Sequence, residues 1–201
     1  MNGTPAIHNF QAEKLNMKTI ALLLLIPTLL STPGFVLGQE APVMPKPTQE
    51  HLWLQKFTGE WTTESEAVMG PDQPPMQCSG TLSSRQLGGF WVLNEMKGEM
   101  SGVPMTGIQT IGYDEGKAKY VGTWVDSMTA FMWKYEGSVD QSGKVLTLDA
   151  DGPNFMGDGK LTKFQDIYEF KSADEMLITS RMLGDDGKWV TFMSGTAKRV
   201  K

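Results

Sequence analysis

The chain has 201 residues, of which 40% are hydrophobic and 20% charged, with 22 glycines, 11 prolines and one cysteine. This composition excludes a disordered chain and a collagen-like chain, and the single cysteine excludes a small disulfide-rich scaffold. The net charge of -5 argues against a nucleic-acid partner, because binding along a phosphate backbone requires a clustered basic face.

The first 38 residues have the three parts of a secretory signal. Two lysines, Lys14 and Lys18, lie before an apolar run that extends from Thr19 to Leu37. Val36 and Gly38 stand at the -3 and -1 positions of a cleavage site. We predict a signal peptide over residues 1–38 and a protein that is exported, either to the periplasm or out of the cell. Residue 17 is a second candidate for the start of the chain.

The same apolar run has a second interpretation as a membrane anchor, because its 19 residues approach the ~20 that span a bilayer core. Pro27, Pro33 and Gly34 interrupt the run, so we favour cleavage and expect no membrane association afterwards. In an oxidising compartment Cys78 would have no partner within the chain, and we interpret it as a small buried residue of a strand.

Residues 39–47 contain three prolines and are predicted to form an extended linker. A short helix is predicted to follow, with Thr48 as its N-cap and Gly59 after its end. His51 lies in this helix and is expected to be exposed to solvent. The folded domain is predicted to span residues 48–201.

Beyond Gly59 the chain consists of short segments rich in β-branched and aromatic residues, separated by turns that contain glycine or aspartate. Their spacing of roughly 8 to 12 residues is typical of an all-β sandwich or barrel. Ten strands are predicted, over residues 60–69, 76–87, 90–100, 105–113, 117–126, 129–139, 144–150, 160–170, 176–183 and 188–199. The turns leave no room for crossover helices, so consecutive strands should pair antiparallel in an up-and-down meander. Closure into a barrel removes the exposed edges of such a sheet.

The start and the end of this region resemble the closed end of lipocalin barrels. Gly59-Glu60-Trp61 follows the predicted helix like the Gly-x-Trp opening of those barrels, and Arg199 matches the terminal arginine that lies over the tryptophan. The resemblance implies that Gly59, Trp61 and Arg199 close one end of the barrel through a cation–π contact of ~0.5 to 2 kcal/mol.

Further motifs are similar to those of a bacterial secreted family catalogued as a domain of unknown function, number 1579. They are Gly88-Gly89-Phe90-Trp91, residues 107–114, residues 124–128 and Tyr135-Glu136-Gly137. The resemblance covers about residues 49 to 200. It implies a lipocalin-like, calycin-type barrel and carries no known activity.

The alternation of side chains along each strand predicts which of them face the interior. The interior positions with groups suited to contact a ligand are Asn94, Trp124, Asp126, Trp133, Tyr135, Asp166 and Tyr168. Asp166 lies between aromatic residues in the middle of a strand, which favours the interior. Asp126 lies at a strand end, where its carboxylate has a second interpretation as an acceptor for backbone N–H groups of the following turn.

The scarcity of histidine removes several kinds of chemistry. His8 and His51 are the only histidines, and His8 lies in the predicted signal. No strand therefore offers a haem-binding histidine, and histidine-dependent zinc or nucleophilic catalysis is excluded. The 14 methionines allow a cuprous site, but they lack a regular spacing, so we interpret most of them as flexible lining of a core or pocket. No metal and no cofactor is predicted.

The leading hypothesis is an exported barrel that binds a small hydrophobic molecule in its interior without transforming it. One alternative is a filled barrel that serves as a structural or interaction module of the cell envelope. Another is an isomerase-like enzyme in which Asp166 or Asp126 acts as general base and Tyr168 or Tyr135 as general acid. The loop over residues 152–159 has an apolar tip and is interpreted as an ordinary surface loop or as a lid over a cavity mouth.

Overall fold

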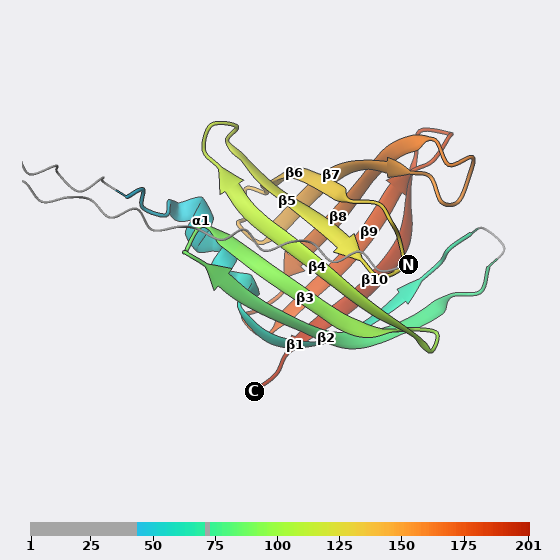
Figure 1. Ribbon diagram of the computed structural model, residues 1–201, viewed down its shortest axis with the longest axis horizontal. Helices are drawn as coiled ribbons and strands as arrows, with labels where there is room; N and C mark the ends of the chain where they lie inside the picture. The colour runs from blue at the N-terminus through green and yellow to red at the C-terminus, as the bar shows by residue number, and fades with distance from the viewer. Residues whose placement is uncertain (1–43, 71–72) are drawn as a thin grey trace, which may run out of the picture. The chain divides into compact units, whose positions relative to one another are not determined.

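Ten antiparallel strands close into a barrel in the computed structural model, which describes residues 44–70 and 73–201 (Figure 1). Each strand pairs with its neighbours in the sequence, and β1 pairs with β10 to complete the barrel. The predicted all-β, up-and-down barrel is therefore confirmed. The predicted signal over residues 1–38 and the first five residues of the predicted linker lie outside the described residues.

The observed elements agree with the predicted strands to within a few residues at most ends. They are α1 (Gln49–Trp53), a turn of 3-10 helix η1 (Leu54–Phe57), β1 (Gly59–Ala67), β2 (Met76–Leu87), β3 (Trp91–Met100), β4 (Val103–Asp114), β5 (Lys119–Asp126), β6 (Trp133–Val139), β7 (Val145–Pro153), β8 (Leu161–Phe170), β9 (Glu175–Leu183) and β10 (Trp189–Arg199).

The sixth strand begins four residues later than expected, at Trp133 rather than Thr129. The cause is Asp126, whose Oδ1 accepts the backbone N–H groups of Met128 at 2.8 Å and Thr129 at 2.9 Å. This side chain holds the backbone after β5 in a turn, which competes with strand pairing. The carboxylate of Asp126 thus has the second of its two predicted roles.

The helix α1 lies at one end of the barrel (Figure 1), and the prediction that its histidine is exposed is wrong. His51 is only 3% exposed. Its Nδ1 accepts the backbone N–H of Thr48 at 3.0 Å, and its Nε2 lies 3.1 Å from the carbonyl oxygen of Tyr113. Since a carbonyl only accepts, Nε2 carries the proton. The imidazole therefore connects the N-terminus of α1 to the end of β4.

The hydrophobic core fills the half of the barrel next to the helix. Trp61 is fully buried, and its indole N–H donates to the carbonyl oxygen of Phe57 at 2.7 Å. Around it lie inward-facing residues that are at most 8% exposed, namely Leu54, Phe57, Val92, Ile111, Tyr120, Leu146, Leu148, Tyr168, Phe170, Met176 and Ala197. This half of the interior is packed and closed to water.

Arg199 covers Trp61 from outside this core. Its guanidinium carbon lies 4.0 Å from the centroid of the indole, and its Nη1 and Nη2 donate to the carbonyl oxygens of Thr58 and Lys56. Gly59 lies beneath the guanidinium with a φ of 126°, and an added Cβ would stand 2.5 Å from Arg199 Nη1. The three residues occupy the positions that the lipocalin resemblance implied.

Candidate functional site

A layer of polar side chains crosses the middle of the barrel interior. Its seven members come from six strands and are Ser84 of β2, Asn94 of β3, Gln109 of β4, Tyr135 of β6, Asp166 and Tyr168 of β8, and Ser180 of β9. We call these residues the polar layer. All except Asp166 are less than 9% exposed. Buried polar groups of this kind must hydrogen-bond to one another to offset their loss of water.

One hydrogen-bonded chain in the polar layer runs from β2 across the lumen to β8. Ser84 Oγ donates to Asn94 Oδ1 at 2.6 Å, Asn94 Nδ2 donates to Gln109 Oε1 at 2.9 Å, and Gln109 Nε2 donates to the Tyr168 hydroxyl at 2.8 Å. The first two bonds join neighbouring strands. The third joins β4 to β8, which three strands separate along the wall, so it spans the interior. The chain forms a floor above the packed half.

A second group in the polar layer centres on the Asp166 carboxylate. Tyr135 donates to its Oδ2 at 2.5 Å, and Ser180 donates to its Oδ1 at 2.5 Å. Burial raises the pKa of Asp166, while the bonds from Ser180 and Tyr135 oppose that rise. Burial, reinforced by the nearby carboxylate, raises the pKa of both Tyr135 and Tyr168. Both phenols therefore remain protonated donors at neutral pH.

Beyond the polar layer, toward the end opposite the helix, the interior is less tightly filled. Met96 and Trp124 face inward, yet each keeps part of its surface accessible to solvent. Trp133 and Phe131 are partly exposed as well. The accessible surface of these side chains indicates that solvent reaches this end of the interior. We call this part of the interior the open half.

The loop between β7 and β8 contributes to the rim of the open half. Phe155 stacks on Phe164, with ring centroids 5.9 Å apart, and meets Phe192 edge-on at 5.1 Å. Trp133 in turn packs edge-on against Phe164 at 4.7 Å. Since the 40% exposed Phe155 reaches inward-facing aromatic residues, the loop tip lies over the mouth and is not a free surface loop.

Two indoles lie flat along the wall of the open half. Trp124 covers Gly107 of the adjoining strand β4, and its Nε1 donates to Asp126 Oδ2 at 2.7 Å. Trp133 covers Gly152 of β7. A methyl group on either glycine would overlap the ring above it. The glycines therefore let both indoles stay against the wall and keep out of the lumen.

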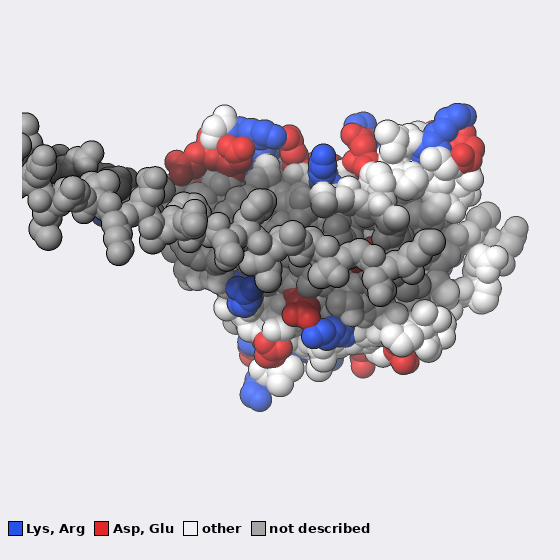
Figure 2. All heavy atoms as spheres, in the orientation of Figure 1, with Lys and Arg blue, Asp and Glu red and all other residues white. Residues whose placement is uncertain are grey.

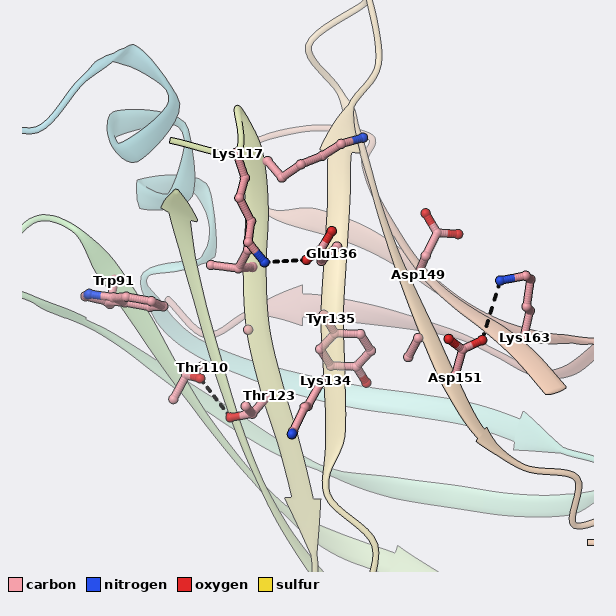
Figure 3. A pocket seen from close by; sticks show the side chains of 14 residues that line it. Trp91, Thr110, Lys117, Thr123, Lys134, Tyr135, Glu136, Asp149, Asp151 and Lys163 are labelled. Carbon is pink, nitrogen blue, oxygen red and sulfur yellow. Dashed lines mark hydrogen bonds and ion pairs between the residues drawn. The ribbon is translucent and has the colours of Figure 1, made fainter. Parts of the chain in front are cut away.

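An outer groove of about 840 Å³ lies over β3 to β8 (Figure 3). Lys117 pairs with Glu136 at 2.5 Å on its surface. Tyr135 also lines the groove, although it belongs to the polar layer, because β6 and β7 pair only over Glu136–Val139 and Leu146–Asp149. The strands are not hydrogen-bonded beside Tyr135, and the groove reaches the barrel wall there.

The structure places all seven predicted site residues on the inner face, in two groups. Asn94, Tyr135, Asp166 and Tyr168 belong to the polar layer, whereas Trp124, Asp126 and Trp133 lie nearer the mouth. Asp126 contributes little to the lumen because the turn and Trp124 use its carboxylate. The sequence reasoning missed Ser84, Gln109 and Ser180, whose inward positions follow from the strand register.

Within residues 44–70 and 73–201, no group of three or more His, Cys, Asp or Glu side chains could hold a metal ion. Cys78 lies on the inner face of β2 as expected but is only half-buried, and burial raises the pKa of its thiol. No helix among the described residues is long and apolar enough to cross a membrane. Figure 2 shows acidic and basic side chains interspersed over the described part of one face.

Residues 46–199 match the family described as "Protein of unknown function (DUF1579)". The chain belongs to this family. A search of curated proteins gives no significant match.

Solved structures resemble the chain in fold. The crystal structure of Rv2717c from M. tuberculosis is similar with a TM-score of 0.58 and 11% identity, over 78% of this chain and all of that chain. The S-type phycobiliprotein lyase CPES from Guillardia theta has a TM-score of 0.49 and 12% identity, over 77% and 99% of the two chains. The structure of EF1p2_mFAP2b bound to DFHBI has a TM-score of 0.41 and 14% identity, over 75% and 99%. These likenesses concern the barrel alone.

Proposed function

We propose that this DUF1579 protein is an exported barrel that binds a small, largely apolar molecule in the open half of its interior. The observation that carries the proposal is the contrast across the polar layer. The inward residues on the helix side nearest this layer, such as Val92 and Ile111, are fully buried, whereas on the other side Met96 and Trp124 remain partly accessible. The accessible walls are apolar and surround a few convergent polar groups, which is the usual make-up of a small-molecule site.

The composition of these walls sets the class of ligand. Met96, Trp124 and Trp133 present thioether and aromatic surface to the lumen. Covering apolar surface contributes roughly 25 cal/mol per Å² removed from water, so an apolar ligand gains affinity from every wall it touches. Methionine adapts its shape at low cost, which suits a site that accepts ligands of similar but not identical outline.

A binding test uses N-phenyl-1-naphthylamine, an uncharged apolar probe that fluoresces when it leaves water. We expect saturable binding by the purified chain, and native mass spectrometry of protein from its own host should show a bound adduct. Met96→Trp fills the open half and should weaken probe binding at least tenfold. Lys97→Trp, the matched control, adds the same side chain on the outer face and should change binding less than twofold. Equal binding by both variants would contradict the interior site.

Export is the second part of the proposal and rests on residues 1–38, with their apolar run and candidate cleavage site. Expression of the full chain in a bacterial host, followed by N-terminal sequencing of the periplasmic fraction, should give a mature chain that begins at residue 39. Retention of the full chain in the membrane fraction would favour the anchor instead.

The Tyr135–Asp166 contact favours a second candidate function, an enzyme with general acid–base chemistry. A buried carboxyl with a raised pKa, bonded to a phenol at 2.5 Å, is typical of proton-transfer sites. Tyr135 and Ser180 each donate to one oxygen of Asp166, however, and these bonds stabilise the carboxylate and make it a weaker base. Carbon-detected NMR titration of Asp166 tests this candidate, and an ordinary carboxyl titration would count against it.

A further inference from the structure

We propose that the ligand carries an uncharged hydrogen-bond acceptor, such as a ketone, ester or amide carbonyl oxygen, which the Tyr168 hydroxyl binds at the polar layer. This inference rests on the proposed function and adds the chemical identity of the ligand's polar end. The apolar remainder of the ligand would extend through the open half toward the mouth.

The hydrogen bonds from Ser84 to Tyr168 all run in one direction. The Tyr168 hydroxyl at the end of this chain therefore still has a proton to donate. Ser84, Asn94 and Gln109 each donate one step onward, and the chain ends on the Tyr168 oxygen, which accepts from Gln109 at 2.8 Å. No atom of the described residues accepts the proton of Tyr168 itself. Tyr168 is 8% exposed, so this proton has little access to bulk water. A buried hydroxyl without an acceptor is costly, and a ligand oxygen would satisfy it.

The remaining groups of the polar layer disfavour a ligand that brings a donor. Asp166 is the strongest acceptor in the layer, but Tyr135 and Ser180 already donate to its two oxygens at 2.5 Å. The Tyr168 oxygen already accepts one bond, from Gln109. A ligand donor such as an alcohol proton would therefore share an acceptor that already has a partner, whereas a carbonyl oxygen would give the Tyr168 proton its first acceptor.

The surroundings also disfavour a charged acceptor such as a carboxylate. Asp166 lies two residues from Tyr168 on the same face of β8, a separation of about 7 Å along a strand. None of the seven polar-layer residues is Lys or Arg, so no cation in the layer would balance a ligand carboxylate. A buried charge without a partner is strongly destabilising. The site therefore favours an acceptor that is polar and uncharged.

The test compares three ten-carbon molecules of matched length, decane, 2-decanone and decanoate, as competitors of the fluorescent probe at pH 8. We expect 2-decanone to bind at least tenfold more tightly than decanoate. Tyr168→Phe should weaken 2-decanone by about three- to tenfold, the effect of one hydrogen bond, and decane by less than twofold. The control Tyr113→Phe removes a hydroxyl outside the polar layer and should leave both affinities unchanged.

Infrared spectroscopy gives a readout that does not depend on a variant. The carbonyl stretch of 2-decanone bound to the unaltered protein should lie at lower wavenumber than in hexane, because a hydrogen bond weakens the C=O bond. An unshifted band, or equal affinity for decanoate, would overturn the inference while the binding function stands. If neither decane nor 2-decanone displaces the probe, the proposed function itself fails.

Discussion

The guanidinium of Arg199 lies 4.0 Å above the indole of Trp61, so the last strand of the chain covers the first. Besides the cation–π contact, Arg199 donates to Thr58 and Lys56 and lies 3.5 Å from Asp174. Lysine is also cationic but cannot donate to several carbonyl oxygens in this fixed geometry. The arrangement therefore requires arginine rather than positive charge alone.

Arg199→Lys should lower the free energy of unfolding by about 2 kcal/mol, because it removes hydrogen bonds and part of the stacking on Trp61. Urea titration followed by circular dichroism measures the change. The neighbouring exposed Lys198 serves as control, and Lys198→Ala should cost less than about 0.5 kcal/mol. Equal costs for the two variants would show that the barrel closure does not depend on Arg199.

Gly59→Ala should lower the free energy of unfolding by about 3 kcal/mol. The backbone φ of 126° strains any residue with a Cβ, and that Cβ would stand 2.5 Å from Arg199 Nη1. Gly102→Ala is the matched control, since its φ is 82° with nothing within 4 Å, and should cost about 1 kcal/mol from strain alone. In an Arg199→Ala background the cost at residue 59 should fall toward that control value. An unchanged cost would contradict the steric explanation.

His51→Leu should lower the free energy of unfolding by about 1 to 3 kcal/mol, because the Thr48 N–H and the Tyr113 carbonyl lose their buried partner. Leu52 lies on the same helix but is 41% exposed, and Leu52→Ala is the control. Hydrogen exchange should show faster opening of α1 in the His51 variant. Unaltered protection of α1 would mean that the imidazole does not hold the helix in place.

Asp166 should make the stability of the protein fall as pH rises above the acidic range. Burial raises the folded-state pKa above the ordinary value of 3.8. Between these two pKa values the folded chain keeps a proton that the unfolded chain has released, so the free energy of unfolding decreases with pH through this window. The contribution of Asp166 is complete below pH 3.8 and is lost once the pH passes the raised pKa.

Asp166→Asn removes this titration while preserving the size of the side chain. Urea unfolding at several pH values between 3 and 8 should show that unaltered protein loses stability relative to this variant as pH rises. Asp149→Asn changes an exposed carboxylate on the outer side of the adjoining strand β7. Relative to this control variant, the unaltered protein should not lose stability as pH rises. If the unaltered protein instead gained stability relative to Asp166→Asn as pH rises, the raised pKa of Asp166 would be contradicted.

The alternation of residues along individual strands was enough to predict the inner face. In β3 and β8, aromatic and aliphatic residues alternate with lysine, glutamate and glutamine, so Asn94, Asp166 and Tyr168 could be placed inside. The turns after β4 and β6 carry clear glycine and aspartate signals. These features act over a few residues, which is why the barrel class and most strand bounds follow from the sequence.

The polar layer depends on contacts that no local pattern contains. Gln109 and Tyr168 are 59 residues apart in the sequence and meet because the diameter of the barrel brings β4 and β8 within reach. Ser84 and Ser180 resemble surface residues of ordinary strands until the register with β3 and β8 is known. His51 looked like an exposed helical residue because its acceptor, the Tyr113 carbonyl, belongs to a distant strand.

Gly107 and Gly152 influence how wide the mouth of the barrel is. Because each glycine accommodates an indole against the wall, the width of the mouth depends on the absence of a methyl group at these two positions. Alanine at either position would push Trp124 or Trp133 toward the axis and narrow the mouth without a change in any larger side chain. The width of the mouth is thus a property of the two glycines as much as of the two indoles.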